Sequence, residues 1–136
     1  MSRSVSAVIS AAPAPVASYE LLDHARRCLS HAEIADTPAQ RYSASHLAAL
    51  RAAAAVLAAR TAPQLHSRRP RSAWVLLTKV APELSEWATY FAAGALKRAA
   101  AEAGIADAVN AREADDLMRD AESFVGVCTA LLDATD

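Results

Sequence analysis

Residues 38–60 read PAQRYSASHLAALRAAAAVLAAR, and this stretch decides the fold. Thr37, Pro38 and Gln40 form the pattern of a capping box with proline at the first helical position, so we predict a helix that begins at Pro38. It ends near Arg60, before Pro63. Alanine, the best helix former, dominates the stretch. At helical spacing, the expected core stripe of this helix is Leu47, Leu50, Ala54 and Leu57.

An amphipathic helix is also predicted on the N-terminal side, from about Ala17 to Ile34. Its apolar stripe consists of Leu22, Ala25, Leu29 and Ala32, joined by Leu21 and Cys28. The residues before it, 1–15, contain one arginine and a stretch of apolar residues interrupted by serines, which is typical of a disordered tail rather than a secretory signal. We therefore expect one domain over residues 16–136.

Two helices are predicted between residues 72 and 104. Ser72 can cap a short helix through Val80, and Pro82 either kinks that helix or opens a new one. The new helix runs to about Ala103, because Gly104 is a good C-terminal stop. The core candidates of this region are Trp74, Leu77, Leu84, Trp87, Ala88, Phe91 and Ala95.

A last helix follows Asn110-Ala111-Arg112-Glu113, which resembles a second capping box. Its apolar residues at helical spacing are Leu117, Ala121, Phe124, Cys128 and Leu131. Four or five helices joined by short connections predict an all-α, up-and-down antiparallel bundle.

The composition agrees with a small helical domain. Among the 136 residues are 36 alanines but 3 glycines and 5% aromatics, which excludes most all-β folds. No apolar run approaches the ~20 residues of a membrane-spanning helix, so we expect no membrane segment and a cytoplasmic location. Cys28 and Cys128 belong to no close-spaced motif, and we interpret them as buried hydrophobic residues in a reducing compartment.

The charged residues are segregated along the chain, although the formal net charge is only −1. Residues 37–82 contain no acid, whereas residues 83–136 carry eleven acidic and four basic side chains. One interpretation is that the two blocks neutralise each other across packed helices. The other is a basic face for phosphate or for an acidic partner, centred on the loop predicted over residues 61–71. The residues of that face are Arg51, Arg60, His66, Arg68, Arg69, Arg71 and Lys79.

Three pairs fit an Arg-x4-6-His spacing: Arg26 with His31, Arg41 with His46, and Arg60 with His66. We favour Arg41 and His46 as catalytic candidates, because they lie in the first turns of the second helix and inside the basic block. Five helical residues correspond to a rotation of about 140°, so the two side chains point in different directions. The alternative interpretation of His46 is a packing histidine that is hydrogen-bonded to a neighbouring helix.

Metal and nucleotide chemistry find little support in the sequence. One helix face contains His24, Cys28 and His31, but these residues are spread over about 10 Å along the helix axis. No fourth ligand is evident for a metal ion. Four acidic residues of the last helix, Asp115, Asp116, Asp120 and Glu122, are best interpreted as a solvated face. No P-loop, GxGxxG, GxSxG or HExxH motif occurs. We expect no metal and no cofactor.

Three stretches resemble a small HEPN-domain family of high-GC Gram-positive (actinobacterial) bacteria. They are PAQRYSASHLAALRAAAAVLAAR (38–60), RRPRSAWVLLTKVAPELSEWATYFAAGALKRAAAEAG (68–104) and READDLMRDAESFV (112–125). The resemblance implies a helical bundle that commonly forms a homodimer. In active members, Arg and His of two subunits meet at the interface and cleave RNA without metal. Many HEPN domains are instead inactive modules that bind nucleic acid or protein.

Three hypotheses for function follow. The leading one is a non-catalytic accessory protein whose basic face contacts RNA, another nucleic acid or a protein partner. The second is a metal-independent endoribonuclease, toxin-like, in which Arg41 binds phosphate and His46 acts as acid or base. The third is a purely structural interaction bundle with an exposed apolar patch that includes Trp74, Trp87, Tyr90 and Phe91.

Overall fold

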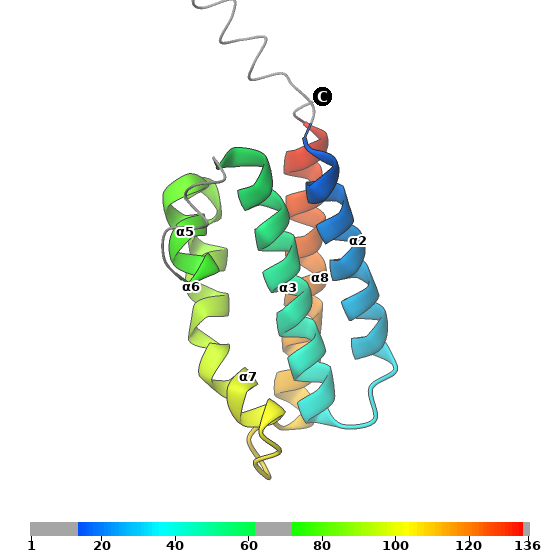
Figure 1. Cartoon of the computed structure of the whole chain (residues 1–136). Helices are drawn as coiled ribbons and strands as arrows, with labels where there is room; N and C mark the ends of the chain where they lie inside the picture. Colours follow the sequence, from blue (N-terminus) through cyan, green and yellow to red (C-terminus); the bar gives the residue numbers. More distant parts are fainter. Residues whose placement is uncertain (1–13, 62–71, 135–136) are drawn as a thin grey trace, which may run out of the picture.

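The computed structural model describes residues 14–61 and 72–134 of the chain. Within these ranges the helices form four antiparallel rods (Figure 1). Helices α2 and α3 are the first two rods, the segments α5, η1, α6 and α7 follow one another along the third, and α8 is the fourth. This arrangement confirms the expected all-α, up-and-down bundle.

The first rod is α2, Val16–Glu33, close to the predicted range. Its core face is amphipathic as expected, although Leu21 and Leu29 are only partly buried. The fully buried positions recur every three or four residues, and they are Ser18, Leu22, Ala25, Cys28 and Ala32. The hydroxyl of Ser18 donates a 2.8 Å hydrogen bond to the carbonyl of Ala55, so this polar residue is satisfied within the core.

The second rod is α3, Pro38–Arg60, which begins and ends where the sequence predicts. The side chain of Thr37 accepts a 3.1 Å hydrogen bond from the backbone N–H of Gln40. In turn the side chain of Gln40 accepts a hydrogen bond from the backbone N–H of Asp36, one residue before the cap. The cap is therefore confirmed, while its reciprocal bond uses a different donor from that of a standard capping box.

The core face of α3 differs from the predicted leucine stripe. Leu57 is buried, but Leu47, Leu50 and Ala54 are only half-buried. Because α3 contacts α2, α8, α5 and α7, most of its circumference faces another helix. Small side chains occupy these contacts and let the backbones approach closely. The most buried apolar residues, at most 1% exposed, are Ala48, Ala49, Ala52, Ala53, Ala55 and Val56.

The third rod is broken where the sequence predicts one helix from Pro82 to about Ala103. Its first helix, α5, is Ala73–Val80, and the side chain of Ser72 caps it by accepting a hydrogen bond from the backbone N–H of Trp74. A short turn, η1 (Pro82–Leu84), leads into α6, Ser85–Ala93. Gly94 ends α6, and α7, Ala95–Glu102, begins directly after it.

The predicted stop at Gly104 is confirmed. This residue has φ of +75°, a conformation that glycine adopts without strain. Its backbone N–H bonds to the carbonyl of Ala101, and the N–H of Ile105 bonds to the carbonyl of Ala100, each at 3.1 Å. These two bonds define a Schellman motif, so α7 ends as the sequence predicts.

The fourth rod is α8, Ala111–Asp133. It starts with the predicted capping box: the Asn110 side chain accepts from the backbone N–H of Glu113 at 2.8 Å, and the Glu113 carboxylate accepts from the backbone N–H of Asn110 at 3.0 Å. Its buried residues include most of the predicted core positions, and they are Ala114, Leu117, Ala121, Phe124, Val125, Cys128 and Leu132.

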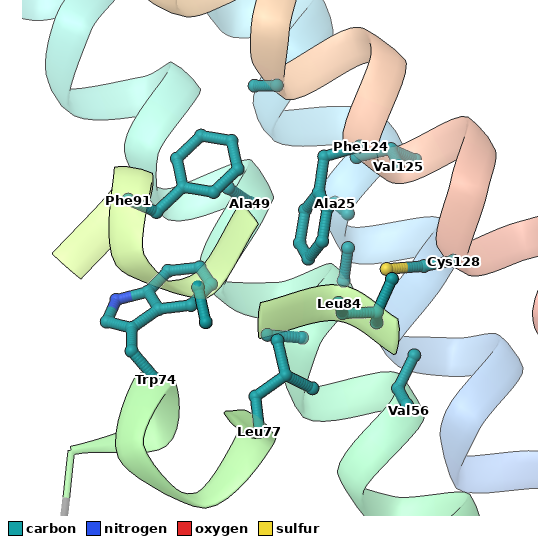
Figure 2. Close-up of a cluster of buried hydrophobic side chains, with 14 of the residues drawn as sticks. Ala25, Ala49, Val56, Trp74, Leu77, Leu84, Phe91, Phe124, Val125 and Cys128 are labelled. Carbon is teal, nitrogen blue, oxygen red and sulfur yellow. The ribbon is translucent and has the colours of Figure 1, made fainter. Parts of the chain in front are cut away.

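Aromatic side chains from α5, α6 and α8 fill the core beside α3 (Figure 2). Trp74 stacks on Phe91 with ring centroids 5.3 Å apart, and Phe91 lies 5.1 Å from Phe124. Trp74 and Phe91 are therefore core residues, and Trp87 is half-buried. This corrects the expected exposed aromatic patch, of which Tyr90 alone is substantially exposed.

Some sequence-based predictions lie outside the described residues. The tail predicted for residues 1–15 precedes the start of α2 at Val16, but residues 1–13 are not described. The same holds for residues 62–71, which contain most of the predicted loop. None of the described helices is both long and apolar enough to cross a bilayer.

The close packing of α3 predicts the effect of enlarging one alanine. Ala52 is 0% exposed, and Ala52→Leu is expected to lower the free energy of unfolding by about 1–3 kcal/mol because the added carbons have no space. The control Ala130→Leu, on the exposed face of α8, should change it by less than about 0.5 kcal/mol. Urea denaturation measures both. Equal stabilities of the two variants would contradict the close packing of α3.

Candidate functional site

Arg41 of the favoured Arg–His pair lies where α3 meets the ends of two other helices. Its Nε donates a 2.9 Å hydrogen bond to the carbonyl of Ala32 near the end of α2. One terminal nitrogen pairs with the carboxylate of Asp115 on α8 at 2.8 Å, and the other lies 3.4 Å from the carbonyl of Glu33. Arg41 thus joins α2, α3 and α8, which is a structural use of a guanidinium group.

His46 lies in the aromatic core and is 1% exposed. Its Nε2 is 2.8 Å from the carbonyl oxygen of Phe91, and since a carbonyl only accepts, Nε2 carries the proton. The ring also makes edge contacts with Trp74 and Phe91. Nδ1 has no hydrogen-bond partner among the described residues. Burial lowers the pKa of His46 below its usual value, so the ring is held neutral.

The two side chains of the pair therefore contact different groups within one protomer. Arg41 binds backbone carbonyls and a carboxylate near one end of the bundle, whereas His46 binds a carbonyl of α6. This agrees with the rotation predicted between them. The geometry matches the packing interpretation of His46, and an arrangement shared between two subunits stays a prediction.

Of the other two Arg–His pairs, the structure describes both members of one, Arg26 and His31. Arg26 binds Asp23 at 3.2 Å and the hydroxyl of Thr129 at 3.1 Å, while His31 is exposed. Arg60 pairs with Glu83 at 2.8 Å, and its predicted partner His66 lies outside the described residues.

Two of the seven basic residues predicted to form a binding face, Arg51 and Arg60, have partners within the bundle. Arg51 donates a 3.1 Å hydrogen bond to Nδ1 of His24, and Arg60 binds Glu83. Lys79 is exposed and makes no ion pair with the described residues. The remaining members, Arg68, Arg69, Arg71 and His66, fall in the segment that is not described. Two ion pairs, Arg41 with Asp115 and Arg60 with Glu83, join the basic block to the acidic one across α3.

The described residues carry a net negative charge. They contain ten basic and fourteen acidic side chains, a formal charge of −4. The part of the bundle that the structure describes therefore carries a net negative charge, and the loop on which the predicted basic face is centred lies mostly outside it.

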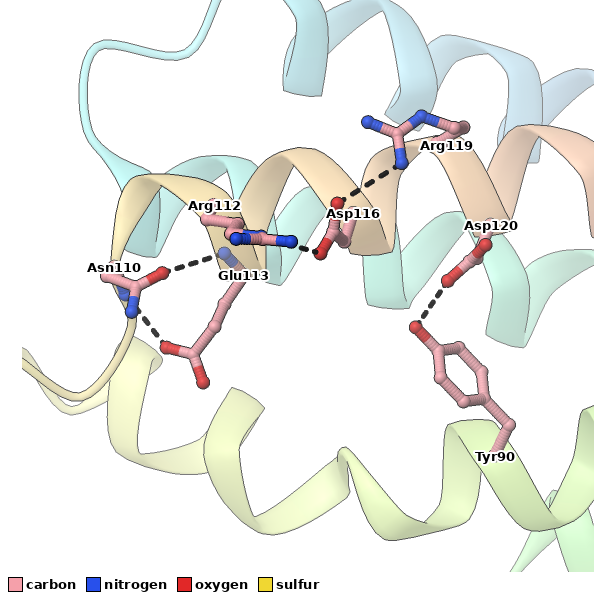
Figure 3. Close-up of polar contacts among 7 residues, drawn as sticks. All are labelled: Tyr90, Asn110, Arg112, Glu113, Asp116, Arg119 and Asp120. Carbon is pink, nitrogen blue, oxygen red and sulfur yellow. Dashed lines mark hydrogen bonds and ion pairs between the residues drawn. The ribbon is translucent and has the colours of Figure 1, made fainter.

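The acidic residues of α8 make more side-chain contacts than we expect of a solvated face. Asp120 accepts a 2.5 Å hydrogen bond from the hydroxyl of Tyr90, and Asp116 lies 3.1 Å from Arg119 and 3.9 Å from Arg112 (Figure 3). Of the four predicted residues only Glu122 is fully exposed, and the others are half-buried. No group of three potential metal ligands comes together in the described parts of the chain.

A groove that the sequence did not predict lies between α8 and the junction of α6 with α7. Its volume is about 440 Å³, within the range of small-ligand sites. The residues that define its walls and ends are Tyr42, Tyr90, Gly94, Lys97, Asp116 and Leu117. Lys97 forms an ion pair with Glu113 at one end. The sequence signal for this groove was Gly94, a glycine within an alanine-rich helical stretch.

Gly94 makes room for the side chain of Tyr42. A Cβ atom at position 94 would lie 2.8 Å from the Tyr42 hydroxyl and 3.6 Å from Cδ2 of His46. Tyr42 is 6% exposed, lines the groove, and makes no hydrogen bond to the described residues. Burial raises its pKa, so the hydroxyl is protonated at neutral pH. The groove thus contains a nearly buried hydroxyl with unused hydrogen-bonding capacity.

Comparison with known proteins gives one match. The family model described as SAV_6107-like HEPN matches residues 32–129, from the end of α2 to the last turns of α8. No curated protein and no solved structure matches the chain.

The burial of His46 predicts a pH-dependent stability. Its folded-state pKa is lowered, so below about pH 6.5 the unfolded chain binds a proton that the folded chain does not. The free energy of unfolding should then fall, by at most about 1.4 kcal/mol per pH unit from this group. His46→Gln keeps an N–H donor but cannot titrate, so this variant should lose less stability than the parent as the pH falls below about 6.5.

The matched control is His31→Gln, which changes an exposed histidine of α2. Chemical denaturation at several pH values measures all three proteins, and His31→Gln should follow the parent. If His46→Gln and the parent lose the same stability on acidification, the buried neutral state of His46 is contradicted.

Proposed function

Because the chain belongs to the SAV_6107-like HEPN family, we propose that it is a non-catalytic accessory protein that binds a protein partner. The observation that carries this proposal is the position of His46, which is 1% exposed and bonded to the carbonyl of Phe91. A general acid or base must reach the proton that it transfers, directly or through one water. An imidazole in this position does not reach a surface-bound RNA.

A protein partner is favoured over nucleic acid on electrostatic grounds. Binding to nucleic acid depends on positive charge that neutralises phosphates. The described bundle carries −4, and Arg41, Arg51 and Arg60 already bind groups within it. A nucleic-acid contact would depend on Lys79 together with Arg68, Arg69 and Arg71, and those three arginines lie outside the described residues.

Two alternatives stay as predictions. The endoribonuclease requires His46 to leave the core and to meet an arginine, within one subunit or across the homodimer that the family resemblance implies. The purely structural bundle requires an apolar surface, and of its four aromatic candidates Tyr90 is the exposed one, at 44%. The homodimer itself and the cytoplasmic location are likewise proposals.

An RNA assay tests the non-catalytic role. The parent protein, His46→Gln and the control His31→Gln are each incubated with labelled single-stranded RNA in EDTA. We expect intact RNA in every case, because His46, the favoured catalytic histidine, is buried in the core. We also expect no binding that falls steeply between about 50 mM and about 200 mM salt.

Cleavage by the parent and by His31→Gln, but not by His46→Gln, would establish the endoribonuclease and overturn the proposal. Steeply salt-dependent binding without cleavage would restore the nucleic-acid hypothesis. In that case a variant with Arg68, Arg69 and Arg71 replaced by alanine would show whether the undescribed segment supplies the contact.

A further inference from the structure

We propose that the groove between α8 and the α6–α7 junction binds an arginine side chain of the partner protein. This inference rests on the proposed function, since it names the chemistry by which a protein partner is recognised. Four features of the groove carry it: an aromatic wall, an opposing carboxylate, a nearly buried hydroxyl and an acidic surround.

The walls of the groove suit a planar cation. Tyr90 is 44% exposed, and its hydroxyl is held by Asp120 at 2.5 Å, which fixes the ring on one side. Asp116 supplies a carboxylate from α8 on the other side (Figure 3). A guanidinium group can stack on the ring and bind the carboxylate at the same time. Ala93 and Leu117 offer apolar lining for the carbon chain that carries it.

The Tyr42 hydroxyl supplies a further acceptor. This hydroxyl lies next to Gly94, and the Tyr42 side chain is only 6% exposed. The hydroxyl makes no hydrogen bond to the described residues. A phenol oxygen accepts hydrogen bonds, and a guanidinium group offers five N–H donors. Lys97 does not repel the ligand strongly, because its ammonium group is already paired with Glu113.

The charge around the groove is complementary to a cation. Helix α8 carries six acidic and two basic residues. Both basic residues, Arg112 and Arg119, already lie 3.9 Å and 3.1 Å from Asp116, so this carboxylate binds guanidinium groups within its own helix. Their side chains are 91% and 68% exposed, and such surface pairs are weak. An arginine held by the whole groove can therefore displace them.

A titration followed by NMR tests the proposal on the full-length chain. The probes are N-acetyl-arginine amide and its uncharged isostere, N-acetyl-citrulline amide. We expect the arginine probe to shift the backbone amide signals of Tyr90, Gly94 and Leu117. Its apparent Kd should be at least about tenfold lower than that of the citrulline probe, because charge-assisted hydrogen bonds are the stronger ones. Absence of these shifts, or equal affinities for the two probes, overturns the proposal.

Variants on α8 locate the interaction. Asp116→Asn should weaken arginine binding at least about tenfold, whereas Glu122→Gln, an exposed acid outside the groove, should leave it unchanged. Arg119→Ala should strengthen binding, because it removes an internal competitor for Asp116. Unchanged binding by a folded Asp116→Asn variant, or equal losses in Asp116→Asn and Glu122→Gln, overturns the proposal.

The outcome separates this inference from the function on which it rests. If the arginine probe does not bind while RNA is neither cleaved nor bound, the groove assignment fails and the protein-binding role stands. If the chain cleaves RNA in a manner that depends on His46, the proposed function fails, and this inference fails with it.

Discussion

A buried hydrogen bond from Nε2 of His46 to the carbonyl of Phe91 connects α3 to the C-terminal end of α6. It lies next to the junction between α6 and α7. The carbonyl belongs to the last turn of α6, and it also accepts a 3.1 Å hydrogen bond from the backbone N–H of Gly94. Without the bond to Phe91, the buried Nε2–H of His46 would have no partner among the described residues, at a cost of about 1–3 kcal/mol. Because the bond holds α6 against α3, Gly94 comes to lie over Tyr42 and next to His46. The groove beside α8 depends on this junction.

Contacts between helices also explain part of the charge pattern of the sequence. Along the chain, basic residues precede acidic ones, but the antiparallel rods bring the two blocks together. Arg41 meets Asp115, and Arg60 meets Glu83. The excess charge left on the described bundle is negative, and α8 carries much of it. Part of the charge segregation in the sequence therefore reflects ion pairs between helices, within a described bundle whose net charge is negative.

The sequence predicts the helix ends well because these are local features. Thr37, Ser72, Gly104 and Asn110 each satisfy backbone groups within a few residues, so their roles follow from short motifs. The buried face of α3 was predicted incorrectly, because it depends on how many neighbours surround the helix. Gly94 alone does not reveal the groove, since its walls come from α3, α6, α7 and α8, and only the tertiary fold brings these together.

The central claim is that His46 is a neutral core residue that donates from Nε2. Two-bond nitrogen–proton NMR correlations of the imidazole ring report its tautomer and its protonation state directly. The account predicts an Nε2–H tautomer with a pKa lower than that of an ordinary histidine. An Nδ1–H tautomer, or a titration midpoint near 6.5, would contradict it.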